Sequence, residues 1–345
     1  MSEEKKGPGF GSAFAPHMLV QHYKDASGWA KAEFQPFGPF TLSPATVVFH
    51  YGQEIFEGFK AYRQPDGSIS LFRPDRNLAR LNASAARLCM PQVDAKILLA
   101  DICRLIKLDA SCVPQRPYTL YIRPCMIGTD TVIKVHPSPA CLLFVITCVV
   151  GEYFAGEDPR GVRLRTETVF VRAAAGGTGA AKCGGNYASS LAAQSQAAAE
   201  GFDQVVWLDA IERKYIEEMG GMNIMFLIGE ALVTPALDSG SILPGVTRES
   251  LLQLVRSQGR KVEEREISVD ELLAENQAGR LKEVFACGTA AVVTPIRELV
   301  HKNQVLYRNA GDKPGELTVS LRQQLMDIQF GSVPDPFGWR YPVPA

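Results

Sequence analysis

The amino-acid sequence predicts a two-domain protein of mixed α/β or α+β class. The first half mixes strand-like and helix-like segments, a segment rich in glycine and charge follows them, and the chain has 345 residues. That length is long for one hydrophobic core but suits two domains of ordinary size. Gly151–Gly161 holds three glycines and a proline among charged residues, so we expect it to link a smaller domain over residues 1–150 to a larger one over 162–345.

The first domain is predicted to combine short strands with two helices. Apolar residues recur at helical spacing over residues 77–88 and again over 97–108. The predicted strands are 46–50, 68–72 after the Pro-Asp-Gly turn at 65–67, 118–127, and 140–150. The last of these is almost entirely apolar, which is typical of a strand buried on both faces.

The second domain is predicted to begin around a glycine-rich loop at residues 176–185. An alanine-rich helix follows from about 188 to 200, and Gly201 is well placed to end it. The later predicted elements are a strand at 204–208, a helix at 248–257 and a strand at 283–286.

Composition restricts the kind of partner. Hydrophobic residues make up 46% of the chain and charged residues 21%, as in soluble globular proteins. The formal net charge is -1, which provides no field to attract nucleic acid or an anionic membrane, so we expect a small-molecule partner. The longest apolar run, residues 140–150, is about half of the roughly 20 residues that a membrane span requires. The N-terminal residues lack the apolar core of a signal peptide, and we expect a cytoplasmic protein.

Neither the cysteines nor the histidines are spaced like metal ligands. The eight cysteines include no C-x-x-C pair and lie mostly in apolar runs, which predicts buried, reduced thiols. The five histidines show no ligand spacing either. We therefore expect no metal.

The segment with most chemical content is GGTGAAKCGGNY, Gly176–Tyr187, in which Lys182 is surrounded by glycines. Glycines allow a close approach of backbone to a ligand, and a lysine held in a partly dry place becomes an amine nucleophile. A Walker-type phosphate loop is excluded because it requires Gly-Lys-Ser/Thr. A flexible surface loop with a solvated lysine remains an alternative from composition alone.

Two further segments are suited to bind an anion. In ILPGVTRES, Pro and Gly precede a helix whose first turn would expose the N–H groups of Val246 and Thr247 to a phosphate, although Thr247 could equally be an ordinary N-cap. In ACGTAAVVTP, a strand runs into Gly-Thr-Ala, where backbone N–H groups and the Thr289 hydroxyl could meet an anion.

Four other residues acquire meaning only in combination. Tyr121 and Arg123 alternate onto one face of a strand and could bind a carboxylate, or could be a solvent-facing pair. Arg80 lies off the apolar stripe of its helix and would by itself be a surface arginine. Glu218, one of two adjacent acids, would by itself lie in a solvated turn.

Taken in order, these segments resemble the branched-chain aminotransferases, which are fold-type IV pyridoxal-phosphate enzymes. The similarity runs from FGSAF and HYGQEIFEGFKAYR through LFRPDRNLARL, YIRP, GGTGAAKCGGNYASS, EEMGGMNI, ILPGVTR and CGTA to IQFG near the C-terminus. The resemblance implies a two-domain fold like that of D-amino acid aminotransferase, with the cofactor at the domain interface and the reactive lysine in the larger domain.

The resemblance also assigns the cofactor-binding residues by position. Lys182 would be the Schiff-base lysine and catalytic residue, Tyr187 would bond the phenolic oxygen, and Glu218 would pair with the pyridine nitrogen of pyridoxal 5′-phosphate. The implied phosphate-binding residues are Arg80, Val246, Thr247 and Thr289. Arg172 would contact these cofactor-binding residues without contacting the cofactor itself.

For the substrate, the resemblance implies that Thr289 and Ala290, with Tyr121 and Arg123, surround the α-carboxylate. Tyr51, Phe56 and Tyr153 would pack against an aliphatic side chain. A loop of the partner subunit near Ile133 and Val135 would close the pocket, which implies at least a homodimer.

The implied reaction is reversible transfer of an amino group between leucine, isoleucine or valine and 2-oxoglutarate in a ping-pong cycle. D-amino acid aminotransferase and aminodeoxychorismate lyase are the alternatives within the fold, but they would not be expected to match HYGQEIFEGFKAY and YIRP together. A catalytically silent cofactor-binding homologue is opposed by the joint presence of Lys182, Tyr187 and Glu218. A nucleic-acid-binding module is opposed by the balanced charge.

Overall fold

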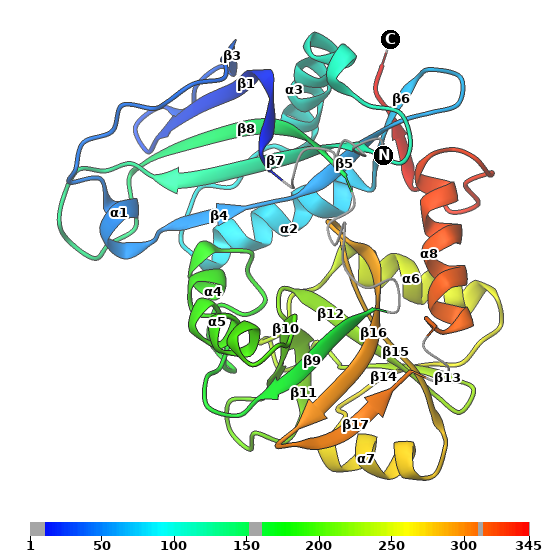
Figure 1. Cartoon of the computed structure of the whole chain (residues 1–345). Helices are drawn as coiled ribbons and strands as arrows, with labels where there is room; N and C mark the ends of the chain where they lie inside the picture. The colour runs from blue at the N-terminus through cyan, green and yellow to red at the C-terminus, as the bar shows by residue number, and fades with distance from the viewer. Residues whose placement is uncertain (1–10, 152–160, 310–312, 345) are drawn as a thin grey trace, which may run out of the picture. The chain divides into compact units, whose positions relative to one another are not determined.

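The computed structural model describes residues 11–151, 161–309 and 313–344 and divides the chain into two compact units (Figure 1). Unit 1 comprises Met1–Ala155, Ala181–Gly184 and Asp327–Ala345, and unit 2 comprises Gly156–Ala180 and Gly185–Met326. Both the C-terminal segment and the four residues around Lys182 therefore belong to unit 1, although their positions in the sequence assign them to the second domain. Most of the expected linker, residues 152–160, lies outside the described residues.

Unit 1 contains one nine-stranded antiparallel sheet with the order β18-β6-β5-β7-β8-β1-β2, while β3 pairs with β1 and β4 with β7. Its strands are β1 (Ala13–Lys24), β2 (Gly28–Trp29), β3 (Glu33–Pro36), β4 (Glu54–Phe56), β5 (Phe59–Arg63), β6 (Ile69–Phe72), β7 (Thr119–Gly128), β8 (Ala140–Val150) and β18 (Arg340–Pro342). Its helices are α1 (Val47–Tyr51), α2 (Pro74–Arg87), α3 (Ala95–Leu108) and the 3-10 turn η1 (Ala110–Cys112). The strands expected at 68–72, 118–127 and 140–150 and both expected helices are confirmed to within three residues.

One element of unit 1 was predicted wrongly. Residues 46–50, expected as a strand, lie mainly in the helical turn α1, which Gly52 ends in the left-handed conformation with φ 60°. The β-branched residues Val47 and Val48 favour a strand locally. The tertiary structure decides otherwise, because Val47 is buried and donates its N–H to the Asp130 carbonyl in the β7–β8 connection.

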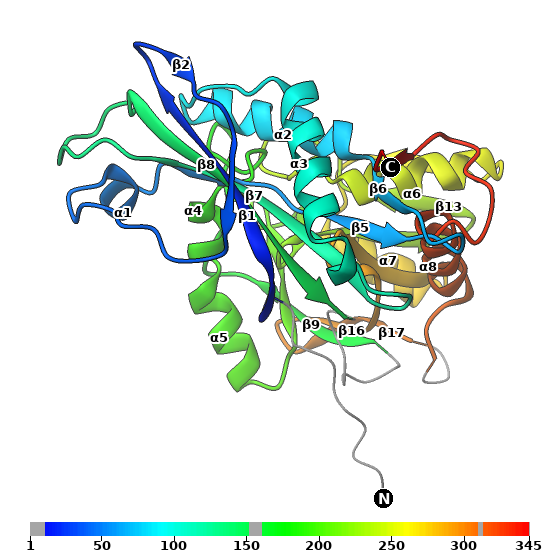
Figure 2. The ribbon, with the colours of Figure 1, turned by 90° about the horizontal axis from the view of Figure 1, so that it is seen from above.

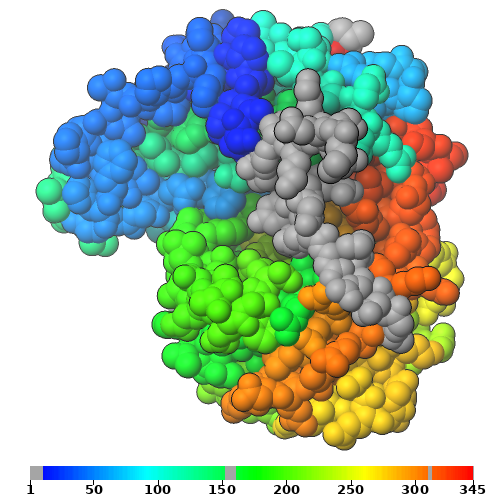
Figure 3. Space-filling view, in the orientation of Figure 1, coloured from blue at the N-terminus to red at the C-terminus, as the bar shows by residue number. Residues whose placement is uncertain are grey.

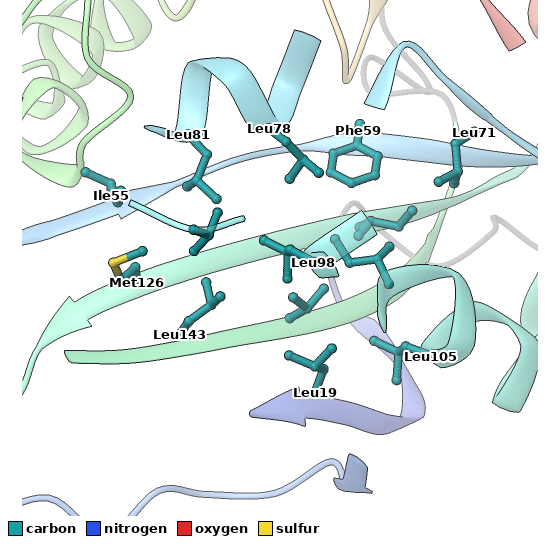
Figure 4. Close-up of a cluster of buried hydrophobic side chains, with 14 of the residues drawn as sticks. Leu19, Ile55, Phe59, Leu71, Leu78, Leu81, Leu98, Leu105, Met126 and Leu143 are labelled. Atoms are coloured by element: carbon teal, nitrogen blue, oxygen red, sulfur yellow. The ribbon is translucent and has the colours of Figure 1, made fainter. Parts of the chain in front are cut away.

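The core of unit 1 lies between α2, α3 and the sheet (Figure 2). Figure 4 shows Leu78 and Leu81 of α2 pointing toward the strands, among the side chains of Phe59, Met126 and Leu143. Ala181 and Cys183 belong to the same cluster of buried side chains. The two neighbours of Lys182 are therefore anchored in the core of unit 1, which excludes the alternative of a flexible surface loop at this point.

Unit 2 contains a second nine-stranded sheet with the order β11-β10-β9-β16-β15-β12-β13-β14, and β17 pairs with β16. Because β11 also pairs with β12, six of these strands form a closed ring of pairings. The strands are β9 (Val162–Glu167), β10 (Gln204–Leu208), β11 (Ile216–Met219), β12 (Met222–Ile228), β13 (Ala231–Thr234), β14 (Val262–Glu264), β15 (Leu281–Gly288), β16 (Val292–His301) and β17 (Gln304–Arg308).

The helices of unit 2 are α4 (Gly184–Ala188), whose first residue belongs to unit 1, α5 (Leu191–Ala199), α6 (Val246–Ser257), α7 (Val269–Gln277) and α8 (Glu316–Gln329), whose last residues belong to unit 1. The predicted alanine-rich helix is confirmed as α5, and Gly201 follows its end with φ 81°. The strands expected at 204–208 and 283–286 and the helix at 248–257 are confirmed as β10, β15 and α6. No helix among the described residues is long and apolar enough to cross a membrane.

Candidate active site

In unit 1, the backbone around Lys182 is tied to β4 and α2. The Lys182 N–H donates to Ser84 Oγ at 2.9 Å, and the Lys182 carbonyl accepts the Phe56 N–H at 2.9 Å. Two residues on, the Gly184 N–H donates to Glu54 Oε2 at 2.7 Å. Bonds on both sides of the lysine fix the point from which its side chain extends. The lysine itself is half-buried, and its Nζ lies 4.8 Å from the centroid of the Phe56 ring.

A guanidinium reaches the same aromatic ring from β7. Arg123 Cζ lies 4.7 Å from the Phe56 centroid, and Arg123 Nη2 donates to Tyr121 Oη at 3.0 Å. Tyr121 is only 6% exposed, so the alternative of a solvent-facing pair is wrong. Gly58 makes room for this phenol, because a Cβ at that position would lie 1.8 Å from Tyr121 Oη. The structure therefore brings the amine of Lys182 and the guanidinium of Arg123 against the same ring.

Arg80 is buried, not a surface arginine. It projects from α2 with a relative exposure of 9%, and its Nε and Nη2 donate to the two carboxylate oxygens of Glu57 at 2.7 and 3.0 Å. Arg80 lies outside the apolar stripe of Leu78 and Leu81, but its side of α2 faces the buried carboxylate of Glu57. The periodicity of apolar residues in the sequence does not reveal such a partner. Glu57 was not predicted as a site residue. Its only signal is an acid in the middle of the otherwise mostly apolar run EIFEGF.

Burial by itself raises the pKa of the Glu57 carboxyl, but the Arg80 charge, its hydrogen bonds and the nearby Lys182 together hold that pKa below its ordinary value. Glu57 also accepts from Asn77 Nδ2 at 2.8 Å and from the Gly58 N–H at 3.0 Å. Glu57 is therefore a fully buried, ionised carboxylate with four donors around it.

The remaining predicted residues of unit 1 lie at its surface. Tyr51, at the end of α1, is 40% exposed. Ile133 and Val135, in the β7–β8 connection, are 69% and 79% exposed. Tyr153 lies outside the described residues. Of the expected aliphatic-pocket residues that the structure describes, Phe56 lies beside Lys182 and Arg123.

In unit 2, Glu218 lies on the buried strand β11 and not in a solvated turn. It is 2% exposed, and its Oε2 lies 3.0 Å from Nη1 of the buried Arg172. Its Oε1 accepts from Asn223 Nδ2 at 3.2 Å and from the Leu243 N–H at 3.0 Å. These donors stabilise a carboxylate in a position that water does not reach.

Asn223 connects this carboxylate to the start of α6. Besides bonding Glu218, its Nδ2 donates to the Leu243 carbonyl at 3.0 Å, and a Cβ at Gly245 would lie 2.0 Å from its Oδ1. Asn223 was not singled out in the sequence, where a polar residue inside the apolar segment MNIMFLI was the available signal. Its amide fixes the spacing between Glu218 and the helix start.

The start of α6 agrees with the expected position of Val246 and Thr247, but it excludes the alternative that Thr247 caps the helix. Val246 and Thr247 are its first two residues, as expected. Gly245 occupies the N-cap position and no side chain caps the helix, so the alternative of Thr247 as the N-cap is wrong. The first-turn N–H groups thus lack the side-chain oxygen that usually satisfies one of them.

Thr289 and Ala290 form the turn between β15 and β16, as the strand-to-Gly-Thr-Ala pattern predicted. Both are half-buried, and the pair Gly288↔Val292 closes the hairpin. Because Cys287 pairs with Asn223 in the neighbouring strand β12, the turn begins two residues beyond the strand position opposite Asn223. The GTA turn and the Glu218 carboxylate therefore share one end of the sheet of unit 2.

Tyr187, on α4, packs against the turn that connects β11 to β12. A Cβ added to Gly221 would lie 3.2 Å from the ring of Tyr187. Glu218 is three residues before Gly221, so the phenol and the carboxylate belong to one neighbourhood of unit 2. The cofactor-binding residues expected in the second domain, apart from Lys182, are thus gathered on adjoining elements.

The cysteines are free thiols, and burial lowers the reactivity of several of them. All eight are free, and five of them are buried. Burial raises the pKa of Cys103 to about 11 and that of Cys141 and Cys287 to about 12, so these thiols are poor nucleophiles near neutral pH. Within residues 11–151, 161–309 and 313–344, no three His, Cys, Asp or Glu side chains form a group that could hold a metal ion.

Comparisons with known proteins identify the family of the chain. The family model "Amino-transferase class IV" matches residues 54–299, well over half of the chain. A branched-chain-amino-acid aminotransferase of Mycolicibacterium smegmatis is 50% identical over 96% of this chain and 91% of its own length. The branched-chain-amino-acid transaminase 1 of Bacillus subtilis is 46% identical over 99% of this chain and 96% of its own length.

Solved structures give the same result. A branched-chain amino acid aminotransferase solved with pyridoxamine 5′-phosphate, from the organism abbreviated T.th., has a TM-score of 0.79 and 26% identity, covering 96% of this chain and 100% of that one. The enzyme from Escherichia coli has a TM-score of 0.77 with the same identity and coverage. The matched family model and the relatives of up to 50% identity along nearly the whole chain identify the same family. The chain belongs to the class IV aminotransferases.

Proposed function

We propose that the protein is a branched-chain-amino-acid aminotransferase that transfers the amino group of L-leucine, L-isoleucine or L-valine to 2-oxoglutarate, reversibly and in two half-reactions. The observation that carries this proposal is the 50% identity, over 96% of the chain, to an enzyme of that name. The site residues support it, because the amine of Lys182 and the guanidinium of Arg123 both lie against the Phe56 ring, and Arg123 donates to Tyr121.

The residues present fit pyridoxal 5′-phosphate. The cofactor requires an amine for its aldehyde, an acid for its ring nitrogen and donors for its phosphate. Lys182 is an amine on an anchored backbone, Glu218 is a buried carboxylate, and α6 begins without a side-chain cap. The residues that we propose to hold the cofactor are Arg80, Lys182, Tyr187, Glu218, Val246, Thr247 and Thr289.

When bound, the cofactor supplies an electron sink for negative charge at the substrate α-carbon. The amine of Lys182 takes the proton from the substrate α-carbon and delivers it to the C4′ position of the cofactor. Glu218 holds a proton on the ring nitrogen, since a carboxylate stabilises an adjacent cation. Arg172 keeps Glu218 in one orientation, and Tyr187 donates to the cofactor's phenolic oxygen.

Substrate binding is proposed to use the face around Phe56. Arg123 and Tyr121, with Thr289 and Ala290, bind carboxylate, and Phe56, Tyr51 and Tyr153 exclude water from an aliphatic side chain. An apolar pocket distinguishes chains that differ by one methylene by only about 1–3 kcal/mol. Overlapping use of the three branched substrates is therefore expected.

We further propose that the enzyme is a cytoplasmic homodimer that acts on small molecules and binds neither nucleic acid nor a membrane. Helix α1 and the β7–β8 connection are neighbours in unit 1 (Figure 3). Exposed apolar side chains lie on both segments. They are Phe49, Tyr51, Val132, Ile133 and Val135. Apolar groups of this kind favour burial against a second copy. All eight cysteines are free thiols, as expected for a protein of the reducing cytoplasm. Replacing Ile133 and Val135 together by aspartate should raise the monomer fraction in light scattering.

The function is tested with a panel of amino donors and 2-oxoglutarate, read together with the visible spectrum of the protein. We expect a yellow protein that uses L-leucine, L-isoleucine and L-valine and produces glutamate. Activity with D-alanine in place of the L-amino acids would identify a D-amino acid aminotransferase instead. A yellow protein without any transamination would indicate a silent homologue, and a colourless protein that transaminates would refute the cofactor.

A further inference from the structure

The ion pair between Arg80 and Glu57 bears on how strongly the site holds a phosphate. Resting on the proposed function, in which Arg80 contacts the cofactor phosphate, we propose that Glu57 moderates that phosphate affinity as the resident counter-ion of Arg80. Its carboxylate neutralises the guanidinium and occupies two of its N–H donors, at 2.7 and 3.0 Å. Glu57 would thus act on the phosphate in two ways, by occupying donors of Arg80 and by its own negative charge.

The environment of the pair makes this interaction strong. The Glu57 side chain has no exposed surface and that of Arg80 is 8% exposed, so neither charge is screened by solvent. Asn77 and the Gly58 N–H hold the carboxylate from the other side, at 2.8 and 3.0 Å. A phosphate that binds Arg80 must therefore share the guanidinium with an anion that is fixed in place.

Two effects of Glu57 on phosphate binding oppose each other. By orienting Arg80, the carboxylate spares the side chain a loss of rotamer freedom on binding. By its own charge it repels a phosphate dianion. Arg80 has little freedom to lose, because it is buried on a helix whose neighbouring positions Asn77, Leu81 and Ser84 are buried as well. The repulsion therefore dominates, and removing the charge of Glu57 should strengthen phosphate binding.

The counter-ion also explains how the chain tolerates Arg80 without a ligand. An unpaired buried cation is strongly destabilising, whereas a buried pair with good geometry is tolerated. The lowered pKa of the Glu57 carboxyl keeps the counter-ion charged at neutral pH. Glu57 thus exchanges some phosphate affinity for stability of the cofactor-free protein.

The test compares pyridoxal 5′-phosphate, pyridoxal and inorganic phosphate as ligands of the full chain after removal of the cofactor. In Glu57→Gln, we expect the dissociation constants of pyridoxal 5′-phosphate and inorganic phosphate to fall about tenfold, and that of pyridoxal to stay unchanged. A purely structural role would change all three together. Weaker or unchanged phosphate binding overturns the proposal and would make Glu57 an orienting residue or a bystander.

The matched control is Asp109→Asn, which removes another buried carboxylate of unit 1. Asp109 is 3% exposed and bonds His17 Nδ1 at 2.6 Å. It is expected to leave the ratio of pyridoxal 5′-phosphate to pyridoxal affinity at the wild-type value. A change as large as that in Glu57→Gln would show that the ratio responds to any buried acid and would overturn the proposal.

A second pair of variants keeps the proposal testable if Glu57→Gln does not fold. Arg80→Met leaves Glu57 as an uncompensated anion, and adding Glu57→Met removes it. The double variant should bind inorganic phosphate more tightly than Arg80→Met alone, and equal or weaker binding would contradict the proposal. Wild-type protein that binds no pyridoxal 5′-phosphate would refute the proposed function itself, an outcome separate from these comparisons.

Discussion

The guanidinium of Arg172 lies 3.0 Å from the carboxylate of Glu218, and the two side chains are 4% and 2% exposed. Arg172 Nη1 also donates to the Ser241 carbonyl at 3.1 Å, which ties this pair to the segment before α6. Glu218 therefore faces a permanent cation from inside unit 2. A buried carboxylate held in this way keeps its direction without a ligand.

Removing one member of this pair should be costly. In Arg172→Met, we expect the free energy of unfolding to fall by about 3 kcal/mol, because Glu218 is left as a buried charge without its cation. Urea denaturation followed by circular dichroism measures the change. In the control Arg104→Met, which breaks an exposed pair with Asp101, the loss should stay below about 1 kcal/mol. Equal losses in the two variants would contradict the role assigned to burial.

The adjacent residues Glu217 and Glu218 should respond differently to the same substitution, because neighbours on a strand point to opposite faces. Glu218→Gln should lower the turnover number by about 100-fold or more, since the proton on the cofactor nitrogen is no longer held. Glu217→Gln should retain turnover, as Ser241 Oγ can still donate to its amide oxygen. Steady-state kinetics on both variants checks this, and loss of turnover in Glu217→Gln would refute the assignment.

The pH dependence of stability gives a second distinction for Glu217. Burial raises the pKa of this carboxyl above its ordinary value of 4.5, and the Ser241 hydrogen bond only partly opposes that effect. Ionisation is therefore more costly in the folded state, so wild-type stability should fall as pH rises through 4.5 toward the raised pKa. Glu217→Gln should reduce this fall and be at least as stable as wild type at pH 7, as thermal melts across pH can show.

The sign is opposite for Glu57. Although burial raises its pKa, Arg80 and Lys182 lower it below 4.5, so the charged form is favoured by folding. The stability that Glu57 contributes is present above pH 4.5 and is lost as pH falls through its depressed pKa. Cofactor-free Glu57→Gln should therefore be less stable than wild type at pH 7, with a difference that shrinks in acid. A difference that stays constant from pH 7 to pH 3 would contradict this.

Lys182→Ala should abolish steady transamination and the visible band of the protein-bound aldehyde. Borohydride treatment of the wild type should attach the cofactor permanently to the peptide that contains Lys182, which mass spectrometry identifies. Lys60→Ala is not a suitable control, because Lys60 lies opposite Tyr121 in the sheet. The exposed Lys261→Ala is suitable and should retain both the band and the activity. Labelling of another lysine would move the reactive amine elsewhere.

Two glycines of the glycine-rich loop at residues 176–185 should differ sharply in their tolerance of substitution by alanine. A Cβ at Gly179 would lie 2.1 Å from the Ser241 carbonyl oxygen, a backbone atom that cannot yield easily. At Gly185, a Cβ meets nothing within 4 Å, and the residue lies in α4, where alanine is favourable. We expect Gly179→Ala to lower the melting temperature by several degrees and to reduce turnover, and Gly185→Ala to be nearly neutral. Equal effects would show that the close approach is not required.

Much of the local structure could be predicted from the sequence. The spacing of Leu78 and Leu81 identified α2, and the apolar segment 140–150 matched β8 residue for residue. Such patterns can be recognised in a sequence because side chains of a helix or strand return to the same buried face at a fixed spacing. The strand predicted at 46–50 was wrong, since this segment is held in the helical turn α1 with a hydrogen bond from Val47 to Asp130, more than 80 positions away.

The sequence by itself determined the family, and through the resemblance to that family it proposed the reactive groups. Matches in register along the whole chain single out Lys182, Tyr187, Glu218 and Arg80, whatever their surroundings. Only the tertiary structure decided that Arg80 and Glu218 are buried and which ions face them, Glu57 for one and Arg172 for the other. The reason is that charge pairing follows distance in space. Pairs separated by 23 and 46 positions leave no periodic trace in the order of residues.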